Sequence, residues 1–589
     1  MNKHQFSGSG GPVKLGGNKN NNGAIAMSLD DYLSTLQQLQ AAAWPAGKPR
    51  EPQYPLGRLP LDEYLRHWAR EQPEACAIDF YGRSLSWAEL DHAAERCAAL
   101  LASLGVQPGD RVAVYLPNCP QLHIAFYGIL RLGAIYVPVS PLARGLELSY
   151  QLNDSGARTL LAFDQLLPFV RQVRGETAIE HLLATSLSEL RPAQPSIPVP
   201  DLLLAPKVAG DDFIDFLPAL AACSDAAPRH SVQLDDIAAL NYTGGTTGLP
   251  KGCIHSHGDM LYTCASFAPV AMNLGRDDTL LNFLPEFWIA GENSGLLFPV
   301  YAGCRLVLLA RWDAEAFMAA VEHYQVTHCG LLVDSAAEVL DHPQLARYDL
   351  RSLKQTGSIS FIKKLTRDYR RRWFELTGTT LFEFSFGMTE THTCDTFTAG
   401  LQDDDFDLTS APTFVGLPVP GTAFKVCDFS SGELLPLGSE GELCVRSPSL
   451  LKGYWNRPEE SAAALRDGWL HTGDLGQITE QGFIRYLGRR KEMLKVNGMS
   501  VFPSELEAML GQHPAIAASA VIGRADERRG QVPVAFIVLK PGSSETADSL
   551  AAWCRDAMAV YKVPEIRLAE SLPMTATGKV KKNELEALL

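Results

Sequence analysis

The chain has 589 residues, of which 46% are hydrophobic and 20% charged, and its formal net charge is -15 at pH 7. This length exceeds what one hydrophobic core supports, so we expect at least two domains, and the acidic charge argues against nucleic acid as a partner. The longest apolar stretch, Ile124 to Val139, is interrupted by Arg131, which leaves no run long enough to span a membrane.

The N-terminal segment and the cysteines bear on where the protein works. Residues 1–26 are rich in Gly, Asn and Ser and lack the apolar core of a signal peptide. We interpret them as a disordered leader or an expression tag, with Met27 as a natural start. The 12 cysteines form no C-x-x-C pair, which disfavours a metal or redox site and favours reduced thiols in a cytoplasmic protein.

Strands alternate with helices from Leu59 onward. Apolar runs bounded by turn residues predict strands, and runs with helical periodicity predict helices. In chain order we expect a strand pair within 77–85, a strand at 112–116, a helix at 121–132, strands at 134–139, 280–284 and 305–309, and a helix at 314–323. This order predicts an α/β architecture with mainly parallel sheets. The Pro-, Ala- and Asp-rich stretch 191–230 is expected to be a surface excursion.

Beyond Gly421 the pattern changes to short strands separated by turn signals, at 424–427, 441–446 and 483–487, which predicts a small β-rich subdomain. After Gly488, a helix at 504–510, strands at 518–522 and 534–539 and a helix at 550–558 predict a compact α+β domain. The charged segment near Lys491 has no apolar side, so we expect the chain to divide into domains 27–490 and 491–589.

A glycine-rich stretch, Tyr242 to Gly252, follows an apolar run that predicts a buried strand. Glycines let the backbone approach a ligand closely, and the N–H groups, threonine hydroxyls and lysine of such a loop can cradle phosphate oxygens. The spacing does not match the Walker pattern. His255-Ser256-His257 could suggest a metal-ligand pair, but its place directly after the loop favours a structural role.

The glycine-rich stretch resembles the phosphate loop of the ANL superfamily, which contains acyl-CoA synthetases, adenylation domains of peptide synthetases and luciferases. The family usually has Ser at the position of Gly244. The resemblance implies that ATP phosphates are bound by Thr243, Gly244, Gly245, Thr246, Thr247, Gly248 and Lys251.

Five further segments resemble the family's motifs, in the family's order. Phe384 to Glu390 is similar to the aromatic-Gly-Met-Thr-Glu motif, which implies that Phe386 stacks on adenine, Thr389 binds the α-phosphate and Glu390 binds Mg²⁺. Trp469 to Asp474 is similar to the segment whose carboxylate, here Asp474, binds the ribose hydroxyls.

The other three segments lie close to the C-terminus. Gly488 to Glu492 resembles the hinge, with Arg489 contacting ribose or phosphate and Lys491 absorbing the rotation of the small domain. Met493 to Gly498 resembles the loop that lines the pantetheine channel, with Lys495 and Gly498 as candidate contacts. Thr575 to Lys579 resembles the terminal motif, which implies that Lys579 is catalytic.

The resemblance implies a two-step reaction that uses ATP, Mg²⁺ and coenzyme A. Attack of a carboxylate on the α-phosphate of ATP forms an acyl-adenylate and releases pyrophosphate. Because negative charge builds on phosphorus, catalysis depends mainly on positioning and electrostatic stabilisation. A thiol then takes the acyl group after the small domain has rotated.

The segment Leu284 to Gly291 corresponds to the lining of the acyl pocket. Amino-acid-activating members have Asp at the position of Trp288, and because Trp cannot bind the substrate ammonium as Asp does, an amino-acid substrate is disfavoured. Many acyl-CoA ligases have His there, so Trp288 departs from that pattern too. Short-chain members have Trp at the position of Gly387, so Gly387 is expected to leave space for a larger acid. The resemblance implies a pocket lined by Phe287, Trp288, Gly357, Ser358, Gly387 and Met388.

We therefore expect an acyl-CoA synthetase for a medium or long fatty acid, or for an aryl or alicyclic acid. Two alternatives remain open. One is a free-standing adenylating enzyme that loads a carrier protein or acylates an amine. The other is a non-catalytic adenylate-binding protein, against which the intact Glu390, Asp474, Arg489 and Lys579 argue.

Overall fold

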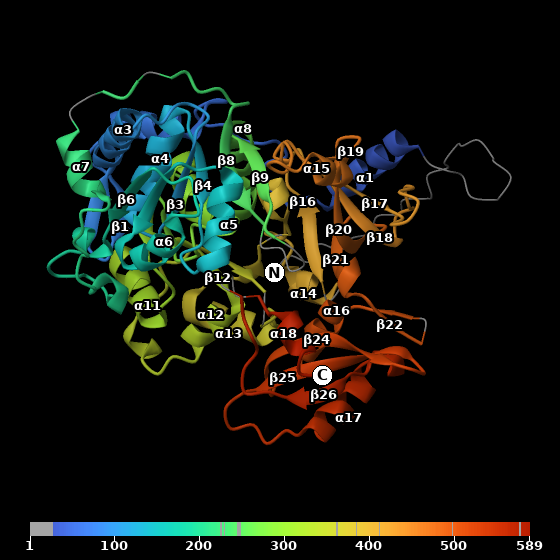
Figure 1. The fold of residues 1–589 in the computed structure, drawn as a ribbon. Coiled ribbons are helices and arrows are strands. Elements are labelled where there is room, and N and C mark those ends of the chain that lie inside the picture. The colour runs from blue at the N-terminus through green and yellow to red at the C-terminus, as the bar shows by residue number, and fades with distance from the viewer. Residues whose placement is uncertain are drawn as a thin grey trace.

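The computed structural model describes residues 28–589, except 224–225, 229, 244–248, 361–362, 385, 411–412, 498 and 576–578. The elements form a large body, which runs from blue to yellow in Figure 1, and a smaller red body that carries the C-terminus. Among the helices of the described residues, none is long and apolar enough to cross a membrane.

One seven-stranded sheet has the order β7-β6-β5-β3-β4-β8-β9 and is parallel except for β9, which pairs antiparallel with β8. Its strands are β3 (Arg111–Tyr115), β4 (Ile135–Pro138), β5 (Thr159–Phe163), β6 (His181–Thr185), β7 (Ile214–Asp215), β8 (Ile237–Tyr242) and β9 (Gly252–Ser256).

The second seven-stranded sheet has the order β14-β13-β12-β10-β11-β1-β2 and is parallel except for β2. Its strands are β1 (Cys76–Phe80), β2 (Arg83–Ser86), β10 (Thr279–Asn282), β11 (Arg305–Leu308), β12 (His328–Leu332), β13 (Gln355–Ile359) and β14 (Leu381–Glu383). The predicted α/β class with mainly parallel sheets is confirmed.

Helices cover and separate these sheets. They are α2 (Leu61–Glu71), α3 (Trp87–Ser103), α4 (Pro120–Leu132), α5 (Gly145–Ser155), α6 (Leu167–Arg174), α7 (Phe216–Ala222), α8 (His257–Phe267), α9 (Ile289–Gly291), α10 (Phe298–Ala302), α11 (Ala314–Tyr324), α12 (Val333–Leu340) and α13 (Arg367–Thr377). Every residue of α4 is buried. Pro120 starts this helix and Gly133 ends it with φ 74°, a backbone conformation that favours glycine.

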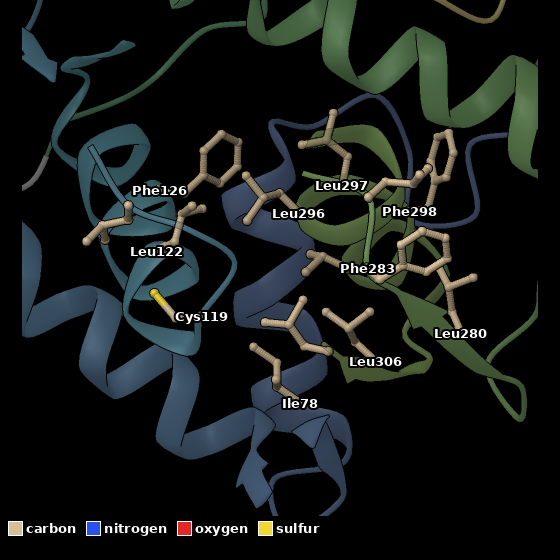
Figure 2. Close-up of a cluster of buried hydrophobic side chains, with 14 of the residues drawn as sticks. Ile78, Cys119, Leu122, Phe126, Leu280, Phe283, Leu296, Leu297, Phe298 and Leu306 are labelled. Carbon is tan, nitrogen blue, oxygen red and sulfur yellow. The ribbon is translucent and has the colours of Figure 1, made fainter. Parts of the chain in front are cut away.

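The core joins α4 to the second sheet (Figure 2). Leu122 and Phe126 of α4 lie in one apolar cluster with Ile78, Leu280 and Leu306 of β1, β10 and β11. Leu296 and Leu297 complete it from the π-helix η5 (Glu292–Leu297). This packing holds the end of η5 in the core, while the start of η5 carries the polar residues Glu292 and Asn293.

Arg131, which interrupts the apolar stretch of the sequence, is buried in α4 as an ionic junction. Its guanidinium lies 2.7 Å from Asp62 of α2, and 2.5 Å and 3.2 Å from Asp91 and Glu95 of α3. These carboxylates raise the pKa of Arg131 against the opposing effect of burial. The charge is retained in the interior because several carboxylates compensate its desolvation.

The expectation for 191–230 is wrong in part. Within this stretch β7 adds an edge strand to β6, and α7 follows directly. Phe216 at the start of α7 is 1% exposed. Because both elements are short, they show no periodicity that would reveal them in the sequence.

An antiparallel sheet of the order β15-β16-β21-β20-β18-β17, with β19 beside β20, follows. Its strands are β15 (Thr396–Phe397), β16 (Phe414–Pro418), β17 (Ala423–Cys427), β18 (Glu440–Arg446), β19 (Leu465–Arg466), β20 (Trp469–Ile478) and β21 (Ile484–Arg489). The helices α1 (Leu29–Ala43), α14 (Phe406–Thr409) and α15 (Pro458–Ala464) accompany it.

The small C-terminal body has its own apolar cores. Its sheet has the order β23-β22-β25-β24, with β26 beside β25. The elements are β22 (Leu494–Val496), β23 (Met499–Val501), α16 (Pro503–Leu510), β24 (Ile516–Asp526), β25 (Gly530–Leu539), α17 (Ala547–Ala557), β26 (Glu565–Leu568) and α18 (Lys582–Glu586).

A groove of about 270 Å³ separates the small body from the large one beside α13. Lys364 and Asp368 line it from the large body, and Gln512, His513 and Lys540 line it from the small one. Nearer the connection, the Ser504 hydroxyl of α16 donates a hydrogen bond to the Leu487 carbonyl of β21 at 2.5 Å.

Candidate active site

The antiparallel pair β8 and β9 anchors both ends of the glycine-rich stretch. The Thr243 N–H donates to the Lys251 carbonyl at 2.9 Å, and the Lys251 N–H donates to the Thr243 hydroxyl at 3.2 Å. The five predicted phosphate contacts between them, Gly244, Gly245, Thr246, Thr247 and Gly248, lie outside the described residues.

Lys251, Tyr454 and Glu390 come together beside this anchor. The Lys251 ammonium lies 4.0 Å from the centroid of the Tyr454 ring. The Tyr454 hydroxyl donates to Glu390 Oε1 at 2.9 Å. Burial and the Glu390 charge raise the pKa of Tyr454, which keeps this hydroxyl a donor. Tyr454 belongs to no predicted motif, and only the fold brings it to Glu390.

Thr389 and Glu390 lie in a short 3₁₀ turn, η7 (Thr389–Thr391), and buried side chains hydrogen-bond to this turn. His255 Nε2 lies 2.7 Å from the Thr389 carbonyl and, as an N–H, donates to it. Burial lowers the pKa of His255, which favours the neutral ring. This position agrees with the structural role predicted for the histidine pair.

The residues after the turn have an unusual backbone. His392, Thr393 and Cys394 have φ values of 58°, 55° and 64°. Residues other than glycine seldom adopt this backbone conformation. Asp395 follows and accepts the Thr391 hydroxyl at 2.5 Å. Burial raises the pKa of Asp395 to about 8, so a neutral carboxyl supports the turn at pH 7.

Phe386 lies in the segment between β14 and η7. Its ring is half-buried, and its centroid lies 5.6 Å and 6.3 Å from those of Tyr486 and Phe424. The Phe386 N–H donates to the Thr396 hydroxyl at 2.9 Å. These contacts orient the aromatic ring predicted to stack on adenine.

Asp474 and Arg489 face each other across β20 and β21. Arg489 Nε lies 2.5 Å from Asp474 Oδ1. Burial raises the pKa of Asp474 to about 7, Glu390 adds to this effect and Arg489 opposes it. A buried carboxylate with a guanidinium at its edge can accept ribose hydroxyls and hold a phosphate at the same time.

Lys579 reaches this charge cluster from the small body. Its carbonyl accepts a hydrogen bond from the Thr575 N–H at 2.7 Å. Desolvation by the surrounding protein and the Arg489 charge lower the pKa of Lys579, whereas Asp474, Glu390 and Glu492 raise it. These charges from both bodies therefore act on one another at one place. Glu492, which no site prediction included, is also 3.0 Å from Lys582.

Two predicted residues lie away from this cluster. Lys491 is exposed in the 3₁₀ turn η9 (Arg490–Glu492). Lys495 is exposed on β22, and its N–H donates to Gln531 at 2.8 Å. Gly498 lies outside the described residues.

The predicted acyl-pocket residues occupy different surroundings. Phe287 and Trp288 are half-buried at the start of the helical segment α9. Ser358 is buried, and its hydroxyl donates to the Phe382 carbonyl at 3.0 Å. Met388 packs on an apolar cluster that contains Tyr454.

Glycines 357 and 387 are both closely approached by other groups. A Cβ at Gly357 would lie 2.0 Å from Cε1 of Phe384. A Cβ at Gly387 would lie 2.5 Å from the Cys394 nitrogen. The space expected beside Gly387 for a larger acid is therefore filled by main chain at the Cβ position, because the unusual turn after His392 folds back against it.

The residues present fit the groups that an adenylate-forming reaction needs. Carboxylate oxygens such as those of Glu390 are ligands that Mg²⁺ prefers, and bound Mg²⁺ would neutralise phosphate charge. Asp474 offers buried acceptors, while Lys251, Arg489 and Lys579 supply positive charge on different sides.

Comparisons with known proteins agree with this geometry. The family described as AMP-binding enzyme matches residues 65–455, and the AMP-binding enzyme C-terminal domain matches residues 505–579. A long-chain-fatty-acid–CoA ligase of Bacillus subtilis (strain 168) is 33% identical over 555 residues, which are 92% of this chain and 97% of that protein. A 4-coumarate–CoA ligase 2 of Oryza sativa subsp. japonica is 31% identical over 90% of this chain and 92% of that protein.

Among solved structures, the anthranilate CoA ligase AuaEII in complex with anthranoyl-AMP has a TM-score of 0.78 and 27% identity, and the similarity covers 90% of this chain and 97% of that one. The chain belongs to the AMP-binding enzyme family. The predicted enzyme class is confirmed: the protein is an AMP-forming acid–thiol ligase of the acyl-CoA synthetase branch, which uses ATP, Mg²⁺ and coenzyme A.

Proposed function

We propose that the acid is larger than acetate, and that it is a medium or long fatty acid or an aryl or alicyclic acid. The relatives named above act on acids of these kinds. Gly387 no longer supports this choice, since its Cβ position is filled. The proposal therefore depends on the relatives and on the half-buried Phe287 and Trp288, which offer an apolar wall.

The convergence of Lys579 with Asp474, Arg489 and Glu390 is the observation that carries the residue assignments. Asp474 accepts the ribose hydroxyls, and Arg489 and Lys579 stabilise negative charge that builds on the α-phosphate. Thr389 donates to the same phosphate, and Phe386 stacks on adenine. Thr243 and Lys251 hold the outer phosphates with the rest of the loop.

The test is a panel of acids with ATP and Mg²⁺, with and without CoA. Pyrophosphate release and an acyl-CoA product are expected for acids of six or more carbons, with weak activity on acetate. A preference for acetate would contradict the substrate proposal. Acyl-AMP formed without transfer to CoA would favour a carrier protein or an amine as the acceptor. Binding without pyrophosphate release would favour the non-catalytic alternative.

The second half-reaction is proposed to require rotation of a domain that begins at residue 491. Lys491 would absorb the rotation, and Lys495 and Gly498 would then line the thiol channel. We expect Gly498→Leu to retain pyrophosphate release and to lose thioester formation, because a side chain would fill the channel. A parallel loss of both steps in a folded variant would contradict this mechanism.

A further inference from the structure

Polar side chains gather in the interior directly behind Trp288. They are at most 3% exposed and come from β4, β8, the segment after β10, η5 and the turn after η7. We call them the acceptor cluster; its members are Tyr136, Asn241, Glu286, Glu292, Asn293 and His392.

Hydrogen bonds tie the cluster to the candidate active site. The Glu292 N–H donates to the Trp288 carbonyl at 2.8 Å, so Glu292 lies one helical turn beyond Trp288. Asn241, at the end of the strand that leads into the phosphate loop, donates from Nδ2 to Glu292 Oε2 at 2.6 Å. Asn293 donates from Nδ2 to the His392 carbonyl at 3.0 Å. The acyl-pocket segment, the phosphate strand and the turn after Glu390 therefore meet here.

Most polar side-chain atoms of the cluster lack hydrogen-bond partners within the described part of the chain. These atoms are Glu286 Oε2, Glu292 Oε1, Asn241 Oδ1, Asn293 Oδ1, the Tyr136 hydroxyl and both ring nitrogens of His392. Glu292 Oε1 lies 3.4 Å from His392 Nε2, close enough for electrostatic attraction but not hydrogen-bonded. Burial and the charges of Glu292 and Glu286 raise the pKa of Tyr136, so its hydroxyl stays protonated.

The chemistry of these atoms is one-sided. Glu286 Oε1 is already engaged by His123 Nε2 at 3.0 Å and by Asn282 Nδ2 at 3.3 Å. The unpartnered oxygens of Glu286, Glu292, Asn241 and Asn293 accept when the carboxyls are ionised. Within the cluster only the Tyr136 hydroxyl and one N–H of a neutral His392 ring can donate, so acceptors outnumber donors and a further donor is needed to satisfy them. Buried polar groups are nearly always hydrogen-bonded in native proteins. The apolar side of η5 cannot supply donors, because Leu296 and Leu297 point into the hydrophobic cluster of Figure 2.

We propose that the acceptor cluster is a polar subsite of the acyl pocket, and that it binds an amine carried on the acid at a distance from the reacting carboxylate. This inference rests on the proposed function and narrows its substrate. An ammonium brings three hydrogens and a positive charge to two buried carboxylates, whereas a hydroxyl brings one hydrogen and no charge. The subsite differs from the ammonium site of amino-acid-activating members, because Trp288 stands at that position.

The test compares pairs of acids of the same shape, in which one member carries an amino group where the other carries a methyl group. The pairs are 6-aminohexanoate with heptanoate, and 3- and 4-(aminomethyl)benzoate with the corresponding ethylbenzoates, because these alkylamines are ammonium ions near pH 7. The rate of thioester formation is measured with ATP, Mg²⁺ and CoA for each acid. We expect kcat/KM to be at least ~10-fold higher for the amino member of at least one pair.

Two variants of Glu292 separate recognition from folding. Glu292→Gln keeps the shape and the contact with Asn241 but removes the charge, and it should lower the amino-to-methyl ratio about 10-fold. Glu292→Leu should reverse the ratio by making the subsite apolar. Glu375→Gln, at an exposed position of α13, is the matched control and should leave the ratio unchanged.

The outcomes are distinguishable. If the methyl-bearing test acids form thioesters and no amino-bearing member is preferred, the subsite is rejected and the ligase activity stands. If the enzyme prefers the amino-bearing test acids and Glu292→Gln does not alter this preference, the subsite is also rejected. No pyrophosphate release from any acid overturns the proposed function together with the subsite.

Discussion

Replacing Lys579 with alanine removes a positive charge that the small body brings to the charge cluster around Asp474. In the proposed first half-reaction, negative charge builds on the α-phosphate, and the assignment of Lys579 places its ammonium beside that group. Two unit charges 4 Å apart attract by about 4 kcal/mol at an effective dielectric constant of 20. Loss of one preorganised partner of this kind typically costs about 10²–10³ in rate. We therefore expect acyl-adenylate formation to fall by two to three orders of magnitude.

The measurement is single-turnover pyrophosphate release, compared with transfer to CoA from acyl-adenylate supplied directly. Lys579→Ala should slow the first and leave the second nearly unchanged. Lys581→Ala is the control, because the Lys581 ammonium is 2.8 Å from Glu584 in an exposed pair on the same segment. Wild-type pyrophosphate release in Lys579→Ala would refute the assignment, as would an equal loss in the control variant.

Three further changes test the fold around the site. Burial raises the pKa of Asp395 to about 8, so the folded protein holds a proton that the unfolded chain releases. The free energy of unfolding therefore falls by about 1.4 kcal/mol per pH unit as pH rises from about 4 to 8. The Tm of Asp395→Asn should change less with pH than the wild-type Tm, and equal slopes would refute this. Gly357→Ala places a Cβ 2.0 Å from the Phe384 ring, so we expect a stability loss of about 1–3 kcal/mol and altered preference among acids, with unchanged Tm and preference as the contrary result. Arg131→Met leaves Asp62 buried without its main cation, and urea unfolding should show a loss of about 3–5 kcal/mol; unaltered stability would contradict the ionic junction.

The sequence carried enough information to predict the fold class and the order of the motifs. Strand β3 is a compact apolar run, and helix α4 is a longer apolar run that begins at Pro120 and ends before Gly133, so both are readable locally. The short elements β7 and α7 were missed because two to seven residues show no period. Asp474 could be assigned from its motif, but its place within β20, opposite Arg489 on β21, is visible only in the fold.

Contacts that depend on distant segments could not be predicted. Tyr454 reaches Glu390 across 64 positions of sequence, and no local pattern signals this pair. The filled Cβ position at Gly387 depends on positive φ values at three residues that are not glycine. Glu286 and Glu292 did carry a signal, since two acids stand in an otherwise apolar segment, but their meaning depends on the buried partners that tertiary packing supplies.

The groove beside α13 provides a way to follow the enzyme while it works. Its walls belong to different bodies, so any change in their relative orientation must change the distance between Asp368 and Gln512, which are both exposed. The cysteines of the chain are buried or half-buried, so dyes attached to cysteines introduced at these two positions would label selectively. If the small body rotates as proposed, energy transfer across the groove would report that rotation, at positions outside the candidate active site and the acceptor cluster.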